Sequence, residues 1–259
     1  MISLLINSLG MLAVGIGSVV IWRSISGVGI RSFALGALLW AVAVPPKLAV
    51  FWLTSAHVIG CFRVYLPYPF FIAAAGAFVG CVGSVFEVGI IWIAARIWPA
   101  LGRDAGRAIA IGLGAGAFEA LLLGLVPLLG ALAIAVSLED AEEIRDALQP
   151  ATTTPLFCLL GPAERLIALV VHTASRTLVL LGVAKGKPLL TCSGFVLFAA
   201  IEGSGGALLV SGVAGRHNPS WWNELAILPI ALISLPILWW CYRRWRNKGE
   251  VALLPVCPP

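Results

Sequence analysis

Long apolar runs alternate with short polar caps along almost the entire chain. Seven of these runs reach the roughly 20 residues that an α-helix needs to cross a bilayer. They predict membrane-spanning helices over residues 2–22, 32–54, 68–95, 107–136, 155–184, 189–212 and 224–242. The predicted fold class is therefore all-α, a polytopic membrane helix bundle that forms a single domain over residues 1–259.

Composition supports this interpretation. The chain is 60% hydrophobic and 11% charged, whereas soluble domains are about half apolar and about a quarter charged. The net charge of +5 does not indicate a nucleic-acid partner, because the basic residues lie in the caps between apolar runs, where they contact lipid headgroups. We expect an integral protein of a bacterial or archaeal cytoplasmic membrane, with membrane lipids as partners.

The distribution of basic residues predicts the orientation of the bundle. If the N-terminus lies outside, the inner segments 23–31, 96–107, 185–188 and 243–259 hold eleven of the 17 lysines and arginines. The outer segments then hold only three, Arg63, Arg145 and Arg216. Because cytoplasmic loops carry the excess of basic residues, the predicted topology is N-out and C-in.

A small set of ionisable residues remains inside the predicted spans. Counting about 1.5 Å per residue from the inner caps puts most of them about 14 to 24 Å deep, and Glu164 and Arg165 near the outer interface. Ionisable groups at membrane depth are energetically unfavourable and usually functional. The spacing predicts one polar site shared by five helices, made of Lys47, Glu87, Glu119, Glu164, Arg165, His172, Arg176 and Glu202.

Local spacing supports this site. His172 and Arg176 are one turn apart on the same helix face. Glycines that allow a neighbouring helix to approach closely flank two of the acids. These are Gly112, Gly114 and Gly116 before Glu119, and Gly203, Gly205 and Gly206 after Glu202.

A carboxylate beside an imidazole at this depth suits general-base activation of water. The cation of Arg176 or Lys47 could stabilise a developing oxyanion or hold a peptide carbonyl. The alternative is that these charges only form interhelical ion pairs.

Metal-dependent hydrolysis is a further possibility, with zinc as the divalent metal. His172 would bind it together with two of the acids Glu87, Glu119 and Glu202, with Glu119 first among them. One histidine without cysteine is an unusual zinc ligand set, and the H-E-x-x-H motif does not occur in the chain. The sequence therefore requires no cofactor, although it leaves a metal open.

Four segments in the predicted spans resemble a known family. They are SVFEVGII, GLGAGAFEALLLG, ERLIALVVHTASRTLVL and FAAIEGSGGAL. In this order they are similar to the YhfC family of intramembrane peptidases, distant relatives of the PrsW and CAAX-protease-like membrane proteins. The resemblance covers most of the chain and implies that the acid of the glycine-rich motif is Glu119.

The chain departs from the pattern of that family at three motifs. The first motif has one acid, Glu87, where two adjacent acids and a base one turn later are expected. Ala115 and Phe198 stand where the resemblance implies histidines, and Glu202 stands where it implies an aspartate. These departures make a three-ligand metal centre harder to build.

The resemblance and the residues together predict an intramembrane peptidase that depends on glutamate and histidine, with a membrane protein or peptide as substrate. The catalytic residues would be Glu87 and Glu119 acting on water, His172 assisting, and Arg176 holding the carbonyl. Residues that contact the substrate or support the site would be Lys47, Glu164 and Glu202. The alternatives are an inactive member serving as a membrane scaffold or immunity-type protein, and a transporter that uses the same buried charges.

Overall fold

The chain folds into a bundle of long helices. The computed structural model describes residues 2–136, 156–213 and 221–246, and these ranges contain seven α-helices and no strand. Each of the seven is long and apolar enough to cross a membrane, which confirms the predicted fold class. The helices are α1 (Ile2–Ser26), α2 (Ile30–Tyr65), α3 (Tyr68–Ile97), α4 (Ala105–Ala135), α6 (Phe157–Ala184), α7 (Pro188–Ser211) and α8 (Trp221–Arg246), with a 3₁₀ turn, η1 (Pro99–Gly102), before α4.

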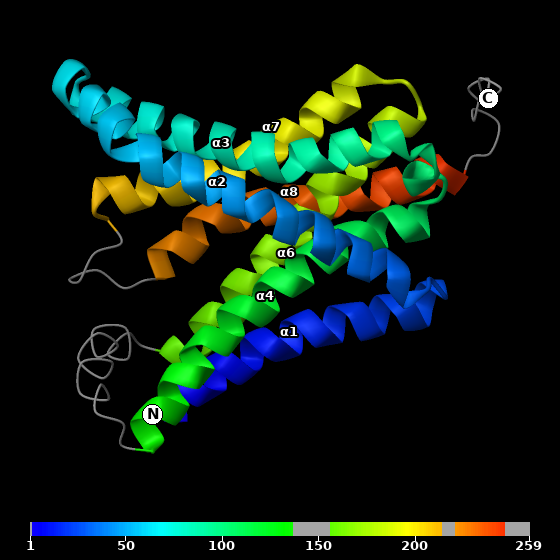
Figure 1. The fold of residues 1–259 in the computed structure, drawn as a ribbon, viewed down its shortest axis with the longest axis horizontal. Coiled ribbons are helices and arrows are strands. Elements are labelled where there is room, and N and C mark those ends of the chain that lie inside the picture. The colour runs from blue at the N-terminus through cyan, green and yellow to red at the C-terminus, as the bar shows by residue number, and fades with distance from the viewer. Residues whose placement is uncertain (1, 137–155, 214–220, 247–259) are drawn as a thin grey trace.

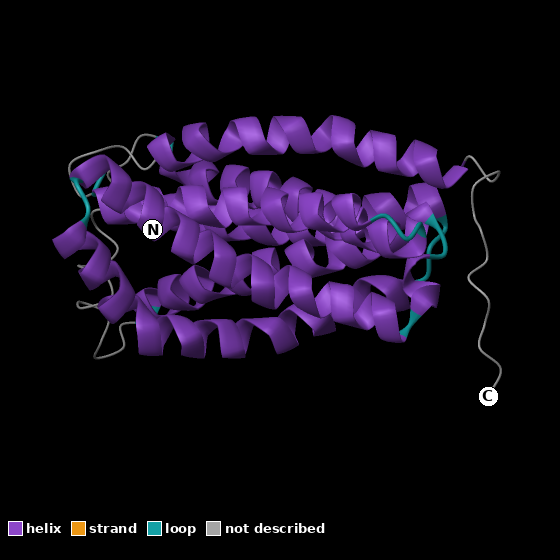
Figure 2. Cartoon of the chain, turned by 90° about the horizontal axis from the view of Figure 1, so that it is seen from above, coloured by secondary structure: helices purple, strands orange, loops and turns teal. Residues whose placement is uncertain are grey.

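The helices run along the length of the molecule, and the described connections lie at its two ends (Figure 2). Helix α1 begins at one end, and α8 finishes at the opposite end (Figure 1). A bilayer holds no water to bond with a backbone, so a spanning segment must satisfy its N–H and C=O groups within its own helix. Which end faces the cytoplasm stays a prediction from the basic residues.

Helix α6 lies at the centre of the bundle. In its most apolar 18-residue window 83% of the residues are buried, whereas the same measure is 22 to 56% in the other six helices. It packs against α1, α3, α4, α7 and α8 (Figure 1). Its buried Val171 and Val179 belong to one apolar core with Ile91 of α3 and Phe198 of α7. A polar residue on α6 therefore faces other helices rather than lipid.

The largest difference from the predicted boundaries is at the end of α2. The apolar pattern ends the span at residue 54, but the helix continues to Tyr65. Nothing in residues 55–65 breaks a helix, and Pro67 forms the N-cap of α3. The apolar pattern indicates where the helix leaves the hydrocarbon core of the membrane, and the helix itself can continue beyond that point. At about 1.5 Å per residue, α2 is roughly 54 Å long and exceeds the roughly 30 Å apolar core.

Most of the glycines next to the acids allow the close approach that the sequence predicts. A Cβ atom on Gly112 would lie 2.8 Å from Cα of Thr173 on α6, and one on Gly116 would lie 3.3 Å from Cβ of His172. On the other side of the bundle, a Cβ on Gly203 would lie 2.8 Å from the backbone oxygen of Gly76 on α3. The prediction is wrong for Gly205, where an added Cβ would meet no described atom of a neighbouring helix within 4 Å. That glycine faces the cavity described below.

The contact between α3 and α7 gives a prediction for stability. A Cβ on Gly80 would overlap the backbone oxygen of Ala199, so Gly80→Ala must push the two helices apart. We expect a loss of about 1 to 3 kcal/mol, the usual effect of overpacking, measured by thermal or SDS-induced unfolding in micelles. Gly60→Ala is the matched control, since Gly60 is also helical but a Cβ added there would meet no described atom of a neighbouring helix within 4 Å. Equal stability of both variants would contradict the tight contact.

Candidate active site

Four side chains from four helices form one ion cluster, which we name the Glu87 cluster. Lys47 of α2 bonds to Glu87 of α3 and also to Oε2 of Glu202 of α7, at 3.0 Å. A terminal nitrogen of Arg176 on α6 donates to Oε2 of Glu87 at 3.0 Å. Arg176 is 0% exposed and Glu87 is 2% exposed. Two cations and two carboxylates therefore compensate one another in the centre of the bundle.

A second group, the Glu119 cluster, contains Glu119 of α4 and three residues of α6. Arg165 donates to Oε1 of Glu119 at 2.9 Å and also bonds to Glu164. Nε2 of His172 lies 3.2 Å from Oε2 of Glu119, so the imidazole contacts the oxygen that Arg165 does not. This cluster has two carboxylates for one guanidinium.

His172 and Phe198 connect the two clusters. The Phe198 ring meets the His172 ring edge to face, with centroids 4.9 Å apart. The guanidinium of Arg176 lies 4.9 Å above the same phenyl ring, and it also donates to the backbone oxygen of His172 at 3.4 Å. The imidazole is 3% exposed and packs against Phe198 beside Glu119, while its Nδ1 has no hydrogen-bond partner among the described residues.

A cavity of about 590 Å³ lies beside the Glu119 cluster. Its walls come from α1, α4, α6, α7 and α8, near the end of the bundle where α1 begins. The side chain of Glu164 is 41% exposed and that of Glu119 is 18% exposed, and both residues line the cavity. The polar residues of the lining are Asn7, Glu119, Glu164, Arg165, His172, Glu202, Asn223 and Glu224.

The structure brings all the predicted site residues close together, but in two groups. Glu119, His172, Glu164 and Glu202 line the cavity. Glu87, Lys47 and Arg176 do not belong to the lining and are held in the buried Glu87 cluster. Arg165, which the depth count put near the outer interface, is 6% exposed and reaches inward to Glu119.

Three polar residues of the cavity did not enter the predicted site. Glu224, in the first turn of α8, is 6% exposed, and its Oε2 has no hydrogen-bond partner among the described residues. Asn223 precedes it, and Asn7 of α1 accepts a hydrogen bond from the backbone N–H of Gly161 at 2.9 Å. The sequence signal for these residues is an acid or amide close to the end of an apolar run. Polar residues at such places usually lie at the membrane–water interface, so this signal does not distinguish a cavity residue from an interfacial one.

The donor set does not fit a catalytic zinc ion. Such an ion takes three protein ligands and one water, but within the described ranges no three side chains of His, Cys, Asp or Glu lie close enough to hold a metal. His172 and Glu119 provide two donors, and one oxygen of that carboxylate is already bonded to Arg165. The positions where the resemblance implies histidines hold the apolar Ala115 and Phe198.

The fold and the site together define an integral membrane protein with a buried, ion-paired polar centre and a cavity beside it. A family model described as YhfC intramembrane metalloprotease matches residues 10–218. The chain belongs to this family, as its four motif segments predicted. No curated protein and no solved structure matches the chain.

Proposed function

We propose that the chain is an intramembrane peptidase in which Glu119 activates the water that attacks a peptide bond. The observation that carries this proposal is the contact of Glu119 with His172 at the wall of a cavity of about 590 Å³. A carboxylate with access to water and a fixed orientation is the arrangement that general-base catalysis requires. Membership in a family of intramembrane metalloproteases supports peptide hydrolysis as the reaction.

The proposed reaction uses this chain's own side chains. Glu119 takes a proton from water, and the water oxygen attacks the peptide carbonyl to form a tetrahedral intermediate. Glu119 then returns the proton to the leaving amine nitrogen as the C–N bond breaks. Nε2 of His172 lies 3.2 Å from Oε2 of Glu119. His172 is thus a positioning residue that keeps the carboxylate directed at the cavity.

Arg165 is the best-placed group for the developing oxyanion. Arg165 lines the cavity beside Glu119, and its two terminal nitrogens bond to Glu119 and Glu164. A fixed cation in a site of low dielectric stabilises negative charge more strongly than it would in water. This role was predicted for Arg176 or Lys47, and both bond to Glu87 in the structure.

In this proposal the Glu87 cluster has a supporting role. Lys47 and Arg176 bond to Glu87 from α2 and α6, and Lys47 also bonds to Glu202 on α7. The cluster thereby fixes four helices around the site and holds the backbone of His172 through Arg176. A membrane-embedded peptide is the proposed substrate, entering the cavity lined by Glu164 and Glu224.

The proposal predicts cleavage that survives metal removal. Purified full-length protein in liposomes should cleave a fluorescence-quenched transmembrane peptide equally well with and without 1,10-phenanthroline. Elemental analysis should find substoichiometric zinc, because the described donor set lacks a third ligand. A zinc-dependent intramembrane protease, assayed beside it, provides the positive control for the chelator. Stoichiometric metal together with chelator-sensitive cleavage would overturn the metal-free reaction.

A non-catalytic membrane scaffold is the second candidate, and one observation favours it. Every carboxylate of the two clusters has a cationic partner, so these charges also serve to join helices. This candidate predicts no cleavage by the wild-type protein under conditions where the bundle is folded. The same peptide assay therefore separates the two functions.

A further inference from the structure

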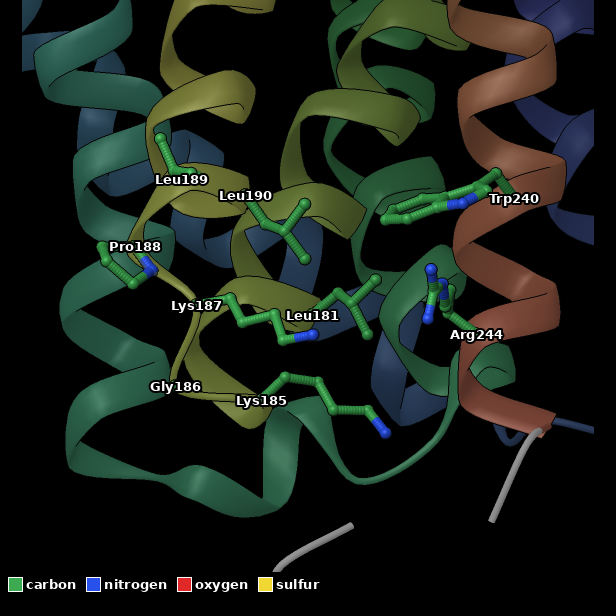
Figure 3. Close-up of a pocket in the computed structure, with 9 residues that line it drawn as sticks. All are labelled: Leu181, Lys185, Gly186, Lys187, Pro188, Leu189, Leu190, Trp240 and Arg244. Atoms are coloured by element: carbon green, nitrogen blue, oxygen red, sulfur yellow. The ribbon is translucent and has the colours of Figure 1, made fainter. Parts of the chain in front are cut away.

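A second cavity, of about 370 Å³, lies at the opposite end of the bundle from Glu164. It is formed by the turn that joins α6 to α7 and by the last part of α8 (Figure 3). Helix α6 ends at Ala184 and α7 begins at Pro188, so the cavity lies where spanning helices meet the membrane interface. Its lining consists of Leu181, Lys185, Gly186, Lys187, Pro188, Leu189, Leu190, Trp240 and Arg244.

The charged part of this lining is entirely basic. Lys185, Lys187 and Arg244 point toward the same space from the turn and from α8 (Figure 3), and none of the nine lining residues is acidic. The Nζ atom of Lys185 is buried and has no hydrogen-bond partner among the described residues. A buried polar group without a partner is unfavourable. The cavity therefore has the electrostatic character of an anion site with one donor still to be satisfied.

Two further features fit a phosphate group. The N-cap of α7 is Lys187, and it makes no side-chain capping bond. The start of this 24-residue helix carries the positive end of the helix dipole and favours an anion. The guanidinium of Arg244 lies 5.2 Å from the Trp240 ring, and this tryptophan is typical of residues at the level of lipid headgroups.

The remainder of the lining is apolar. Leu181, Leu190 and Trp240 form the wall beside the three cations (Figure 3). A soluble anion would leave this wall unused, whereas a phospholipid places acyl chain directly beside its phosphate. Anionic headgroups are also concentrated at a membrane surface, where each nearby lysine or arginine adds about 1 kcal/mol of attraction.

We propose that this cavity is a binding site for the phosphate of an anionic phospholipid, held by Lys185, Lys187 and Arg244. The site lies outside the peptidase centre and does not depend on the proposed reaction. Two of its residues, Trp240 and Arg244, belong to α8, which lies beyond the residues that match the family.

Native mass spectrometry of the full-length protein in detergent tests this proposal. Phosphatidylglycerol and phosphatidylcholine with identical acyl chains are titrated onto wild type and onto Lys185→Gln/Lys187→Gln/Arg244→Gln. Each lost cation should weaken the binding of the first phosphatidylglycerol by about fivefold. We therefore expect the triple variant to bind it on the order of a hundredfold more weakly than the wild type. The control is Arg31→Gln/Arg96→Gln/Arg103→Gln, which removes the same charge from exposed positions at the same end. Because these arginines do not line the cavity, this control variant should weaken binding clearly less than the first triple variant.

Equal weakening in the two triple variants, or none in either, would overturn the site. Millimolar inorganic phosphate is added in a separate arm, and full displacement of the lipid by it would overturn the lipid as occupant. If thermal unfolding shows the first triple variant to be unfolded, Lys185→Gln alone is used, with an expected weakening of about fivefold. Lys185→Arg keeps the cation and should retain most of the affinity.

Discussion

Glu119→Gln is expected to reduce the turnover of a transmembrane peptide by roughly a hundredfold to ten thousandfold, because an amide cannot take the proton of water. The change is nearly isosteric. The amide oxygen can still accept the bond from Arg165 that Oε1 accepts at 2.9 Å in the wild type. The bundle should therefore stay folded, and the loss should fall on kcat with little change in KM.

The measurement is steady-state cleavage in liposomes, with thermal unfolding of each variant as the test of folding. Glu164→Gln is the matched comparison, since Glu164 shares Arg165 with Glu119 but is 41% exposed, and its loss should be smaller. Asp104→Asn, on an exposed residue near η1, is the neutral control. If Glu119→Gln is folded and cleaves at the wild-type rate, Glu119 is not the base.

The largest effect on stability is expected for Glu87→Gln. This change leaves the ammonium of Lys47 with one carboxylate and the fully buried Arg176 with none among the residues it bonds in the described structure. Removing one partner of a buried ion pair usually destabilises by about 3 to 5 kcal/mol, because the other charge stays buried without compensation. SDS-induced unfolding in mixed micelles measures the loss.

A double-mutant cycle gives the decisive comparison. Glu87→Gln combined with Arg176→Met removes both charges, so the double variant should lose less stability than the two single losses added together. Asp104→Asn is again the control, since the exposed Asp104–Arg107 pair should contribute at most about 1 kcal/mol. Additive losses in the cycle would mean that Glu87 and Arg176 act independently, contrary to their contact at 3.0 Å.

The sequence predicted the helices well because the bilayer imposes a simple length rule. Six of the seven predicted spans agree with the observed helices to within four residues at either end. The exception is the C-terminal end of α2, where an apolar pattern cannot reveal that a helix continues past the hydrocarbon to Tyr65. The glycines before Glu119 also predicted close helix packing correctly, because a glycine allows a neighbouring helix to approach at its own position whatever the rest of the fold.

The sequence predicted which ionisable residues lie close together in the bundle but not how they pair. Depth along a helix follows from counting residues, whereas the direction that a residue faces depends on how helices rotate against each other. Glu87 and Glu119 lie at similar depths, and both were predicted to act on the catalytic water. In the structure they belong to different clusters. Arg165 lies near a helix end in the sequence, and only the packing of α4 against α6 shows that it turns inward to Glu119.

The central position of α6 has a consequence for how this protein is made. A charged residue at the middle of a segment adds about 2.5 to 3.5 kcal/mol to its insertion from the translocon, and α6 carries Arg165, Arg176 and the imidazole of His172. Arg165 has one partner on α6 itself, Glu164, but the other partners of these groups, Glu119 and Glu87, are on α4 and α3 and are synthesised earlier. The nascent α6 therefore meets carboxylates already resident in the membrane, and the order of the chain provides these two counter-charges before the arginines of α6 arrive.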